Sequence, residues 1–193
     1  MTRISADPRS PRPAVFLDRD GTLMDEVDYC RDPSDVRVIP GAAHALTEMR
    51  AAGWLAILIT NQSGIGRGRI TLSEYEAVHA EFARQLENQL DAVFFCPDLP
   101  SMASTRRKPE PGMIFEAMQQ FAIDQSRSWM IGDKVADVQC GINADLRTIL
   151  VRTGYGSTYE GPKPDFVAET VVDALSIIVS QDRRIAPTVQ NFA

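Results

Sequence analysis

The sequence is poor in cysteine and contains no long apolar run. It has three cysteines in 193 residues, an odd number at wide spacing, which excludes a disulfide-rich scaffold and indicates reduced thiols. The longest apolar run, residues 54–59, has the length of a strand and is too short to cross a membrane. The residues before the first apolar run lack the apolar core of a secretory signal. We therefore expect a soluble, cytoplasmic protein with no membrane partner.

Basic residues are also scarce relative to acidic ones. Twenty Lys and Arg stand against 26 Asp and Glu, which gives a formal net charge of −6. Because duplex binding depends on clustered Lys and Arg that neutralise phosphates, this balance argues against a nucleic-acid partner. The two histidines, His44 and His79, fall in helical patterns, and we expect neither to be catalytic.

Strand and helix patterns alternate along the chain. Apolar runs predict strands at 14–17, 54–60, 92–95, 129–131, 148–151 and 166–168, and helices at 40–50, 72–90, 111–121, 135–142 and 171–179. This alternation predicts an α/β fold with a mainly parallel sheet covered on both faces. We expect a flexible N-terminal arm over 1–13, one domain over 14–180 and a C-terminal tail over 181–193. The short loops and the lack of an exposed apolar heptad pattern favour a monomer.

A polar cluster follows directly after each of four predicted strands. D-R-D-G-T follows the first, T-N-Q-S-G the second, C-P-D the third and G-D-K the fourth. In open parallel sheets, ligands bind beyond the carboxyl ends of the strands. The four clusters therefore predict one site along one edge of the sheet.

Asp18 and Asp20 end the first strand at a spacing of two residues. Side chains at this spacing in an extended chain face the same way, so both carboxylates can point into one cleft. There, one can attack as an anion while the other transfers a proton. A turn or helix cap is the alternative for Asp-x-Asp-Gly, but the position at the end of a buried strand favours a site.

Two other kinds of site do not fit the spacing. A calcium-binding EF-hand needs Gly at loop position 6 and Glu at position 12, and counting from Asp18 these positions hold Leu23 and Tyr29. The glycines of residues 64–68 have the spacing G-x-G-x-G, whereas a dinucleotide-binding loop needs G-x-G-x-x-G. We expect neither site.

The remaining clusters offer groups suited to a phosphate. Thr60 and Asn61 lie where a strand ends, and a hydroxyl followed by backbone amides can hold an anion. Lys108 precedes a helix, and lysine is a compact positive charge. Asp133 and Asp18 together predict a sparse oxygen site that suits Mg²⁺.

In chain order, these motifs resemble the haloacid dehalogenase (HAD) superfamily of phosphatases. The matching residues are Asp18-x-Asp20-x-Thr22, Thr60, Lys108, and Gly132-Asp133-Lys134 with Asp137. The phrases F-L-D-R-D-G-T, T-N-Q-S-G-I-G-R-G, R-K-P-E-P-G-M and L-V-R-T-G are most similar to the group of D-glycero-D-manno-heptose 1,7-bisphosphate phosphatases and their histidinol-phosphatase relatives. The resemblance covers about residues 15–179. It implies a Rossmann-like three-layer fold without a large cap domain.

The resemblance also implies roles for individual residues. Asp18 would be the nucleophile that forms an aspartyl-phosphate, and Asp20 would be the general acid and base. Mg²⁺ would be held by Asp18, the backbone carbonyl of Asp20 and Asp133. Phosphate and substrate contacts are implied for Thr60, Asn61, Gln62, Ser63, Arg107, Lys108, Lys134, Glu26 and Tyr29. Asp137 is expected to orient Lys134 or to cap its helix.

The third cluster departs from the pattern of this group. Many members hold that loop with zinc, through Cys-x-His and then Cys-x-Cys. Here Cys96 remains, but Asp98, Ser104 and Arg106 occupy the other three positions. Because one thiol cannot form a tetrahedral site, we expect no structural zinc.

The expected function is Mg²⁺-dependent hydrolysis of a small phosphorylated sugar, with removal of the 7-phosphate from the heptose bisphosphate as the leading hypothesis. A phosphatase for histidinol phosphate or another small metabolite is an alternative. A nucleic-acid 3′-phosphatase is disfavoured by the acidic composition. A non-catalytic phosphate-binding module would be indicated by loss of Asp18 or Asp20, and both are present.

Overall fold

The computed structural model describes residues 10–185, which contain a single six-stranded sheet in the order β3-β2-β1-β4-β5-β6. The strands are β1 (Ala14–Leu17), β2 (Leu55–Asn61), β3 (Ala92–Cys96), β4 (Trp129–Gly132), β5 (Arg147–Val151) and β6 (Phe166–Ala168). All pairings are parallel. From the central strand β1, the chain adds β2 and β3 on one side of β1, and then adds β4, β5 and β6 on the other side. This reversal between β1 and β4 is where an open α/β sheet binds its ligand.

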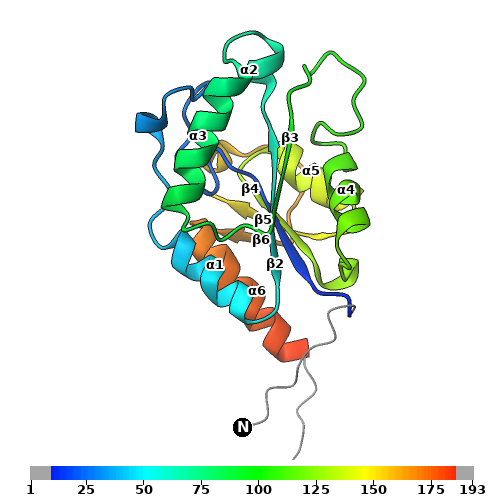
Figure 1. The fold of residues 1–193 in the computed structure, drawn as a ribbon. Helices are drawn as coiled ribbons and strands as arrows, with labels where there is room; N and C mark the ends of the chain where they lie inside the picture. Colours follow the sequence, from blue (N-terminus) through cyan, green and yellow to red (C-terminus); the bar gives the residue numbers. More distant parts are fainter. Residues whose placement is uncertain (1–9, 186–193) are drawn as a thin grey trace, which may run out of the picture.

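Helices cover both faces of the sheet and make three layers (Figure 1). The helices are α1 (Ala42–Ala51), α3 (Leu72–Gln85) and α6 (Val171–Ile185) on one face, and α4 (Gly112–Gln120) and α5 (Val135–Asn143) on the other. The segment between β1 and α1 is a loop with one 3-10 turn, Pro33–Asp35. The expected Rossmann-like fold without a large cap domain is confirmed.

The central strands are apolar throughout because both of their faces are buried. In β1, Val15 and Leu17 pack with α1, α3 and α6, whereas Ala14 and Phe16 pack with α4 and α5. This alternation follows from the two-residue period of a strand. Burial of each large apolar side chain contributes about 1.5–3 kcal/mol, so the two cores fix β1 and the residues that follow it.

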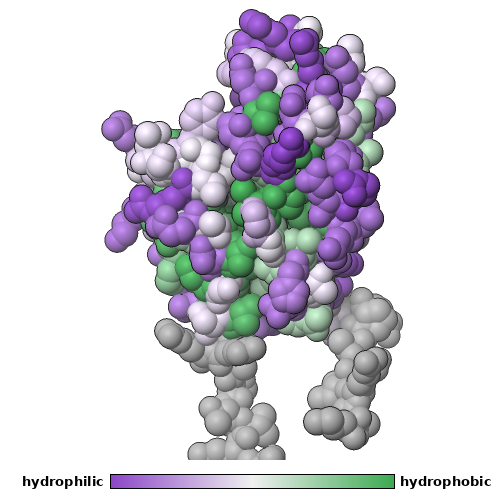
Figure 2. Space-filling model, turned by 90° about the vertical axis from the view of Figure 1, so that its left-hand side faces the viewer, coloured by the Kyte–Doolittle hydropathy of each residue, from purple (hydrophilic) through white to green (hydrophobic). Residues whose placement is uncertain are grey.

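The outer face of the layer formed by α1, α3 and α6 is largely hydrophilic (Figure 2). Figure 2 shows hydrophobic residues as a narrow band between broad hydrophilic areas on the side that α1, α3 and α6 cover. This is the pattern of helices that turn one apolar stripe to a core. No helix in the part of the chain described here is long and apolar enough to span a bilayer.

Several boundaries differ from those expected. The helix expected over 72–90 ends at Gln85, and Glu87 and Asn88 after it both have φ 54°. A short helix, α2 (Ser63–Gly66), was not expected. Of the arm expected over 1–13, residues 1–9 lie outside the described residues. Arg12 pairs with the chain at Ala122, and its guanidinium donates to the carbonyl of Gly53 at 2.7 Å. Helix α6 extends five residues past the expected domain end at 180.

Candidate active site

The site lies at the carboxyl ends of β1 and β4. Leu17 pairs with Ile131 in the sheet, and the Asp18 amide donates to the Ile131 carbonyl at 3.1 Å. Asp18 and Asp133, which follow the two strands, therefore emerge beside each other. The sequence pattern predicted this meeting of two strand ends.

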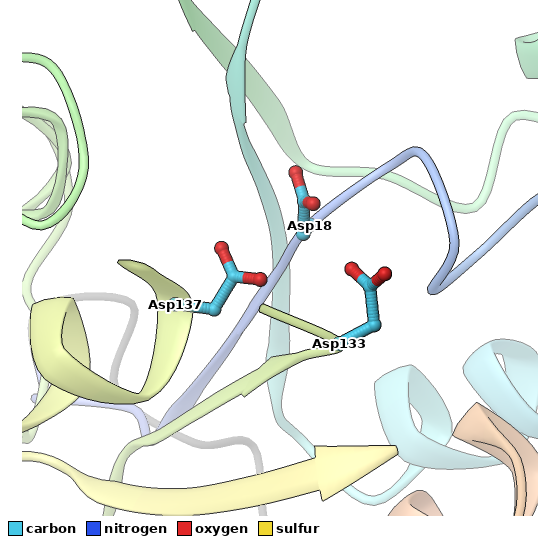
Figure 3. A group of neighbouring side chains, drawn as sticks. All are labelled: Asp18, Asp133 and Asp137. Carbon is cyan, nitrogen blue, oxygen red and sulfur yellow. The ribbon is translucent and has the colours of Figure 1, made fainter. Parts of the chain in front are cut away.

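Three buried carboxylates form a cluster at this point (Figure 3). Asp18 comes from the end of β1, Asp133 from the end of β4, and Asp137 from the first turn of α5. Carboxylate oxygens of the three residues lie within 4.8 Å of one another. Buried like charges at this separation require a compensating cation or a bound proton.

Lys108 supplies part of that compensation. Its Nζ lies 2.8 Å from Asp18 Oδ1 and 2.6 Å from Asp137 Oδ1, and it donates to the Ile59 carbonyl at 2.9 Å. Burial alone would lower the pKa of Lys108, but Asp137 and Asp18 raise it above its ordinary value. Lys108 is therefore a fixed positive charge beside the expected nucleophile.

Asp137 has two roles, one expected and one not. Its Oδ2 accepts the Lys134 backbone N–H at 2.9 Å, which caps the start of α5 as expected. Its contact with Lys108 joins two segments that are distant in sequence, and the sequence pattern did not predict it.

Asp18 and Asp133 differ in their electrostatic surroundings. Burial opposes ionisation of Asp18, but Lys108 and Lys134 bring its pKa below the ordinary value. For Asp133, burial and the nearby charge of Asp18 raise the pKa to about 7. Among the described residues, no basic side chain lies within ion-pair distance of Asp133. Two facing carboxylates, one of them uncompensated, fit a divalent cation with oxygen ligands such as Mg²⁺.

The backbone around Asp133 is closely fitted to its carboxylate. The Tyr155 amide donates to Asp133 Oδ2 at 2.9 Å. Gly21 has φ +81°, and a Cβ at Gly21 or at Gly154 would lie only 2.3 Å from Asp133 Oδ2. Sequence reasoning gave these glycines and Tyr155 no role, although Gly21 and Gly154 both belong to the motifs that carry the family resemblance.

Asp20 is held by two side chains at the wall of a pocket. Its carboxylate accepts from the Arg19 guanidinium at 3.1–3.2 Å and from Gln62 Nε2 at 2.8 Å. Gln62 Nε2 also donates to Thr60 Oγ1 at 2.9 Å. Gln62, expected to touch substrate, therefore contacts the expected acid and base, and Arg19 was not identified from the sequence.

The pocket has a volume of about 180 Å³. Its lining includes six of the expected site residues besides Asp20: Glu26, Tyr29, Asn61, Gln62, Ser63 and Lys134. The Lys134 ammonium lies 2.7 Å from Glu26 Oε2 and 5.0 Å from the centre of the Tyr155 ring. The segment after β1 therefore meets the segment after β4 across this pocket.

Asn61 ties the third loop to the end of β2. Its side-chain amide donates to the Lys108 carbonyl, and its Oδ1 accepts the Lys108 N–H, both at 3.0 Å. Arg107 does not line the pocket of Asp20. Its guanidinium donates to the Asp98 carbonyl at 2.9 Å, and it lines a separate hollow along residues 100–110.

Ser104 is the centre of the loop that precedes Lys108. Its Oγ donates to Asp98 Oδ2 at 2.5 Å and accepts the N–H groups of Arg106 at 3.3 Å and Arg107 at 3.2 Å. It also lies 3.8 Å from Cys96 Sγ. Among the described residues, Asp18, Asp133 and Asp137 form the one group of carboxylates, thiols or imidazoles close enough to hold a metal, and Cys96 and Asp98 are outside it.

Comparisons with known proteins agree with this geometry. A family model described as HAD-hydrolase-like matches residues 105–174. A curated D-glycero-D-manno-heptose-1,7-bisphosphate 7-phosphatase of Thermosynechococcus vestitus is 39% identical over 188 residues, which cover 87% of this chain and 96% of that protein. The D-glycero-beta-D-manno-heptose-1,7-bisphosphate 7-phosphatase of Escherichia coli K12 is 34% identical over 183 residues, with 89% and 96% covered.

A solved structure is similar over most of the chain. It is the D,D-heptose 1,7-bisphosphate phosphatase from B. bronchiseptica, complexed with magnesium and phosphate, with a TM-score of 0.80 and 28% identity. The match covers 88% of this chain and 99% of that one. By its motifs, its fold and these relatives, the chain is a phosphatase of the HAD superfamily and belongs to the family of the heptose 1,7-bisphosphate 7-phosphatases.

Proposed function

We propose that this phosphatase removes the 7-phosphate from D-glycero-D-manno-heptose 1,7-bisphosphate in a Mg²⁺-dependent reaction. The observation that carries the mechanism is the buried Asp18, paired with Lys108 at 2.8 Å and facing Asp133. The substrate is proposed from the names of the curated relatives. Magnesium is proposed from the oxygen donors of the site and from the solved relative that contains it.

Asp18 is suited to be the nucleophile because its surroundings keep it ionised. One of its oxygens attacks phosphorus while the bond from phosphorus to the sugar oxygen breaks, which leaves an aspartyl-phosphate and the sugar alcohol. Asp20 donates the proton that the leaving oxygen needs. It then takes a proton from the water that hydrolyses the aspartyl-phosphate, and inorganic phosphate is released.

The metal would be held by the carboxylates of Asp18 and Asp133 and the backbone carbonyl of Asp20. When bound, Mg²⁺ supplies positive charge that offsets the repulsion between the anionic nucleophile and the phosphate. Asp137 is the third carboxylate of the cluster, but its Oδ1 is ion-paired with Lys108 and its Oδ2 accepts the Lys134 backbone N–H. We therefore assign Asp137 to the support of Lys108.

Positioning and charge stabilisation account for most of the catalysis of phosphoryl transfer. Thr60, Asn61 and Lys108 would hold the phosphoryl oxygens, with Lys134 as a second cation. Glu26, Tyr29, Gln62 and Ser63 would form the wall towards the sugar. Arg107 faces a neighbouring hollow, so a contact with the distal part of the substrate requires its side chain to leave the Asp98 carbonyl.

The test is phosphate release from a panel that includes the heptose bisphosphate, histidinol phosphate and a 3′-phosphorylated oligonucleotide, with and without Mg²⁺. Asp18→Asn keeps the shape of the nucleophile and should abolish turnover. Asp145→Asn is the matched control: Asp145 is exposed with φ 53°, a conformation that Asn tolerates, and activity should not change.

Highest kcat/KM on the heptose bisphosphate, lost in Asp18→Asn, would support the proposal. A preference for histidinol phosphate or the oligonucleotide would refute the substrate and keep the mechanism. Activity that persists in Asp18→Asn would refute the mechanism. The expectations of no structural zinc, a monomer and a cytoplasmic location stay predictions, which metal analysis, light scattering and cell fractionation can check.

A further inference from the structure

We propose that Arg19 is a positioning residue that fixes the carboxylate of Asp20 for proton transfer to the leaving group. This inference rests on the proposed function, because Arg19 would act only through Asp20, the proposed general acid and base. Arg19 lies between the two aspartates of the motif, and alternation along the chain turns its side chain away from theirs in an extended segment. The structure instead brings the guanidinium back onto Asp20.

Arg19 contacts both oxygens of Asp20. Its Nε lies 3.2 Å from Oδ1 and 3.2 Å from Oδ2, and its Nη2 lies 3.1 Å from Oδ1. Both residues line the pocket, but the Arg19 side chain is 1% exposed and that of Asp20 is 14% exposed. The guanidinium is therefore the more deeply buried partner, and the Asp20 side chain keeps some access to the pocket.

Gln62 closes the arrangement into a triangle. Its Oε1 accepts from Arg19 Nη2 at 3.2 Å, and its Nε2 donates to Asp20 Oδ2 at 2.8 Å. Each of the three side chains is thus hydrogen-bonded to the other two. A carboxylate held by donors on both oxygens loses its freedom to rotate, which is the condition for a proton donor that must face one atom of the substrate.

The surroundings of the guanidinium on its other side do not satisfy its hydrogen-bonding capacity. It lies over the Tyr75 ring at 5.4 Å from the centre, a cation–π contact. In the described part of the chain, Arg19 Nη1 and the Tyr75 hydroxyl are buried without a hydrogen-bond partner. Burying an arginine with one nitrogen unsatisfied is unfavourable, so the stability of the fold does not explain why an arginine is placed here.

The loop itself does not depend on the guanidinium. The Arg19 backbone carbonyl accepts the amides of Leu23 at 3.0 Å and Met24 at 3.1 Å, and any residue offers that carbonyl. A change of the side chain can therefore remove the contact with Asp20 and leave the turn after β1 in place. This makes the role of the guanidinium testable by substitution.

The test compares a sugar phosphate, whose alkoxide needs a proton to leave, with p-nitrophenyl phosphate, whose phenolate leaves without one. kcat/KM reports the steps up to cleavage of the bond to the leaving group, so it separates proton donation from later hydrolysis of the aspartyl-phosphate. In Arg19→Met we expect kcat/KM to fall about 100-fold on the sugar phosphate and less than about threefold on p-nitrophenyl phosphate. Because both substrates share the hydrolysis step, kcat should fall on both.

Three further variants make the result specific. Arg50→Met removes a similar arginine–aspartate pair, Arg50 with Asp91 at 2.9 Å, away from the pocket, and should leave the ratio of the two kcat/KM values unchanged. In Arg19→Met combined with Asp20→Asn, kcat/KM should lie within about twofold of Asp20→Asn alone, because a residue that acts only through Asp20 has no effect without it. Arg19→Lys keeps the positive charge but cannot contact both oxygens of Asp20 as the guanidinium does. It replaces Arg19→Met in the comparison of the two substrates if Arg19→Met does not fold.

An equal loss of kcat/KM on both substrates, or a further loss of tenfold or more in the double variant, would overturn the role assigned to Arg19. So would an unchanged ratio in a folded Arg19 variant. Failure of the proposed function would be seen in a different comparison. In that case, phosphate release by the Asp18→Asn variant would equal that of the wild-type chain.

Discussion

Lys108 is the residue on which the charge balance of the site depends. Its ammonium lies between Asp18 and Asp137, and all three side chains are almost completely buried. Removing one member of a buried ion cluster leaves the others uncompensated, which is more harmful than replacing the whole cluster. The same ammonium would stabilise charge on the transferred phosphoryl group, so stability and catalysis share this residue.

Replacing Lys108 with Met should lower the free energy of unfolding by about 3–5 kcal/mol and abolish phosphate release. Urea unfolding at pH 7 measures the first effect and a phosphate assay the second. Lys163→Met is the control: Lys163 is exposed, and the change should stay within about 0.5 kcal/mol. A fully stable Lys108→Met protein would contradict the charge balance described here.

The elements position the site through the turns at their carboxyl ends. The turn after β1 brings Gly21, and the turn after β5 brings Gly154, against the carboxylate of Asp133. Thr153 Oγ1 donates to the Gly21 carbonyl at 2.6 Å, which joins the two turns. Asp133 is therefore enclosed by backbone from both neighbouring strand ends, with no room for a Cβ at Gly21 or Gly154.

Gly21→Ala should weaken Mg²⁺-dependent activity because the new methyl group displaces Asp133. We expect an increase of about 10- to 100-fold in the Mg²⁺ concentration for half-maximal activity. Gly53→Ala is a matched control, since Gly53 also has positive φ, +94°, but has open space around its Cβ position. Both variants should lose about 1–2 kcal/mol from backbone strain, and an equal Mg²⁺ response in the two would refute the contact.

At the scale of elements, much was predictable from the sequence. The strands were recognised because short, continuous apolar runs are typical of strands that are buried on both faces of a parallel sheet. The site residues were recognised because they follow directly after those runs. The helix end at Gln85 and the one-turn helix at Ser63 were not recognised. The φ 54° of Glu87 and Asn88 has no glycine to mark it, and four residues are too few to show a period. Contacts of Arg19 and Asp137 with distant residues depend on the folded chain and leave no local pattern.

For the whole molecule, the metal and the pH dependence of stability are linked through Asp133. Its pKa is about 7 in the fold, against an ordinary value of about 3.9 in an unfolded chain. Between these values the folded protein binds more protons than the unfolded one, so the stability of the metal-free protein falls as the pH rises. Once Asp133 is ionised, a divalent cation relieves the repulsion that causes this loss.

Raising the pH from 5 to 8 in the presence of a chelator should therefore lower the contribution of this group to the free energy of unfolding by about 2.5 kcal/mol. Mg²⁺ should raise the thermal midpoint more at pH 8 than at pH 5. Asp133→Asn should reduce both effects. Thermal unfolding at the two pH values, with and without Mg²⁺, measures them, and an equal response to Mg²⁺ at both would count against the assignment of Asp133.

The three cysteines should be inert in the folded protein. Cys30, Cys96 and Cys140 are buried and free, and burial raises the pKa of each thiol, that of Cys140 to about 12. Because the thiolate is the reactive form, a thiol reagent at pH 8 should titrate the cysteines only after denaturant is added. Rapid reaction of the native protein would show that the cores open locally.

Ser104 gives the loop that precedes Lys108 an attachment that needs neither a metal nor a thiolate. Its hydroxyl joins Asp98 to the amides of Arg106 and Arg107, in the loop where the resemblance implies zinc for many members of the group. Chelators and oxidants remove zinc from cysteine ligands, but they do not react with a serine hydroxyl or break its hydrogen bonds. We expect that the protein can be stripped of its catalytic ion and reloaded repeatedly, even under peroxide, with the loop that carries Lys108 still in place.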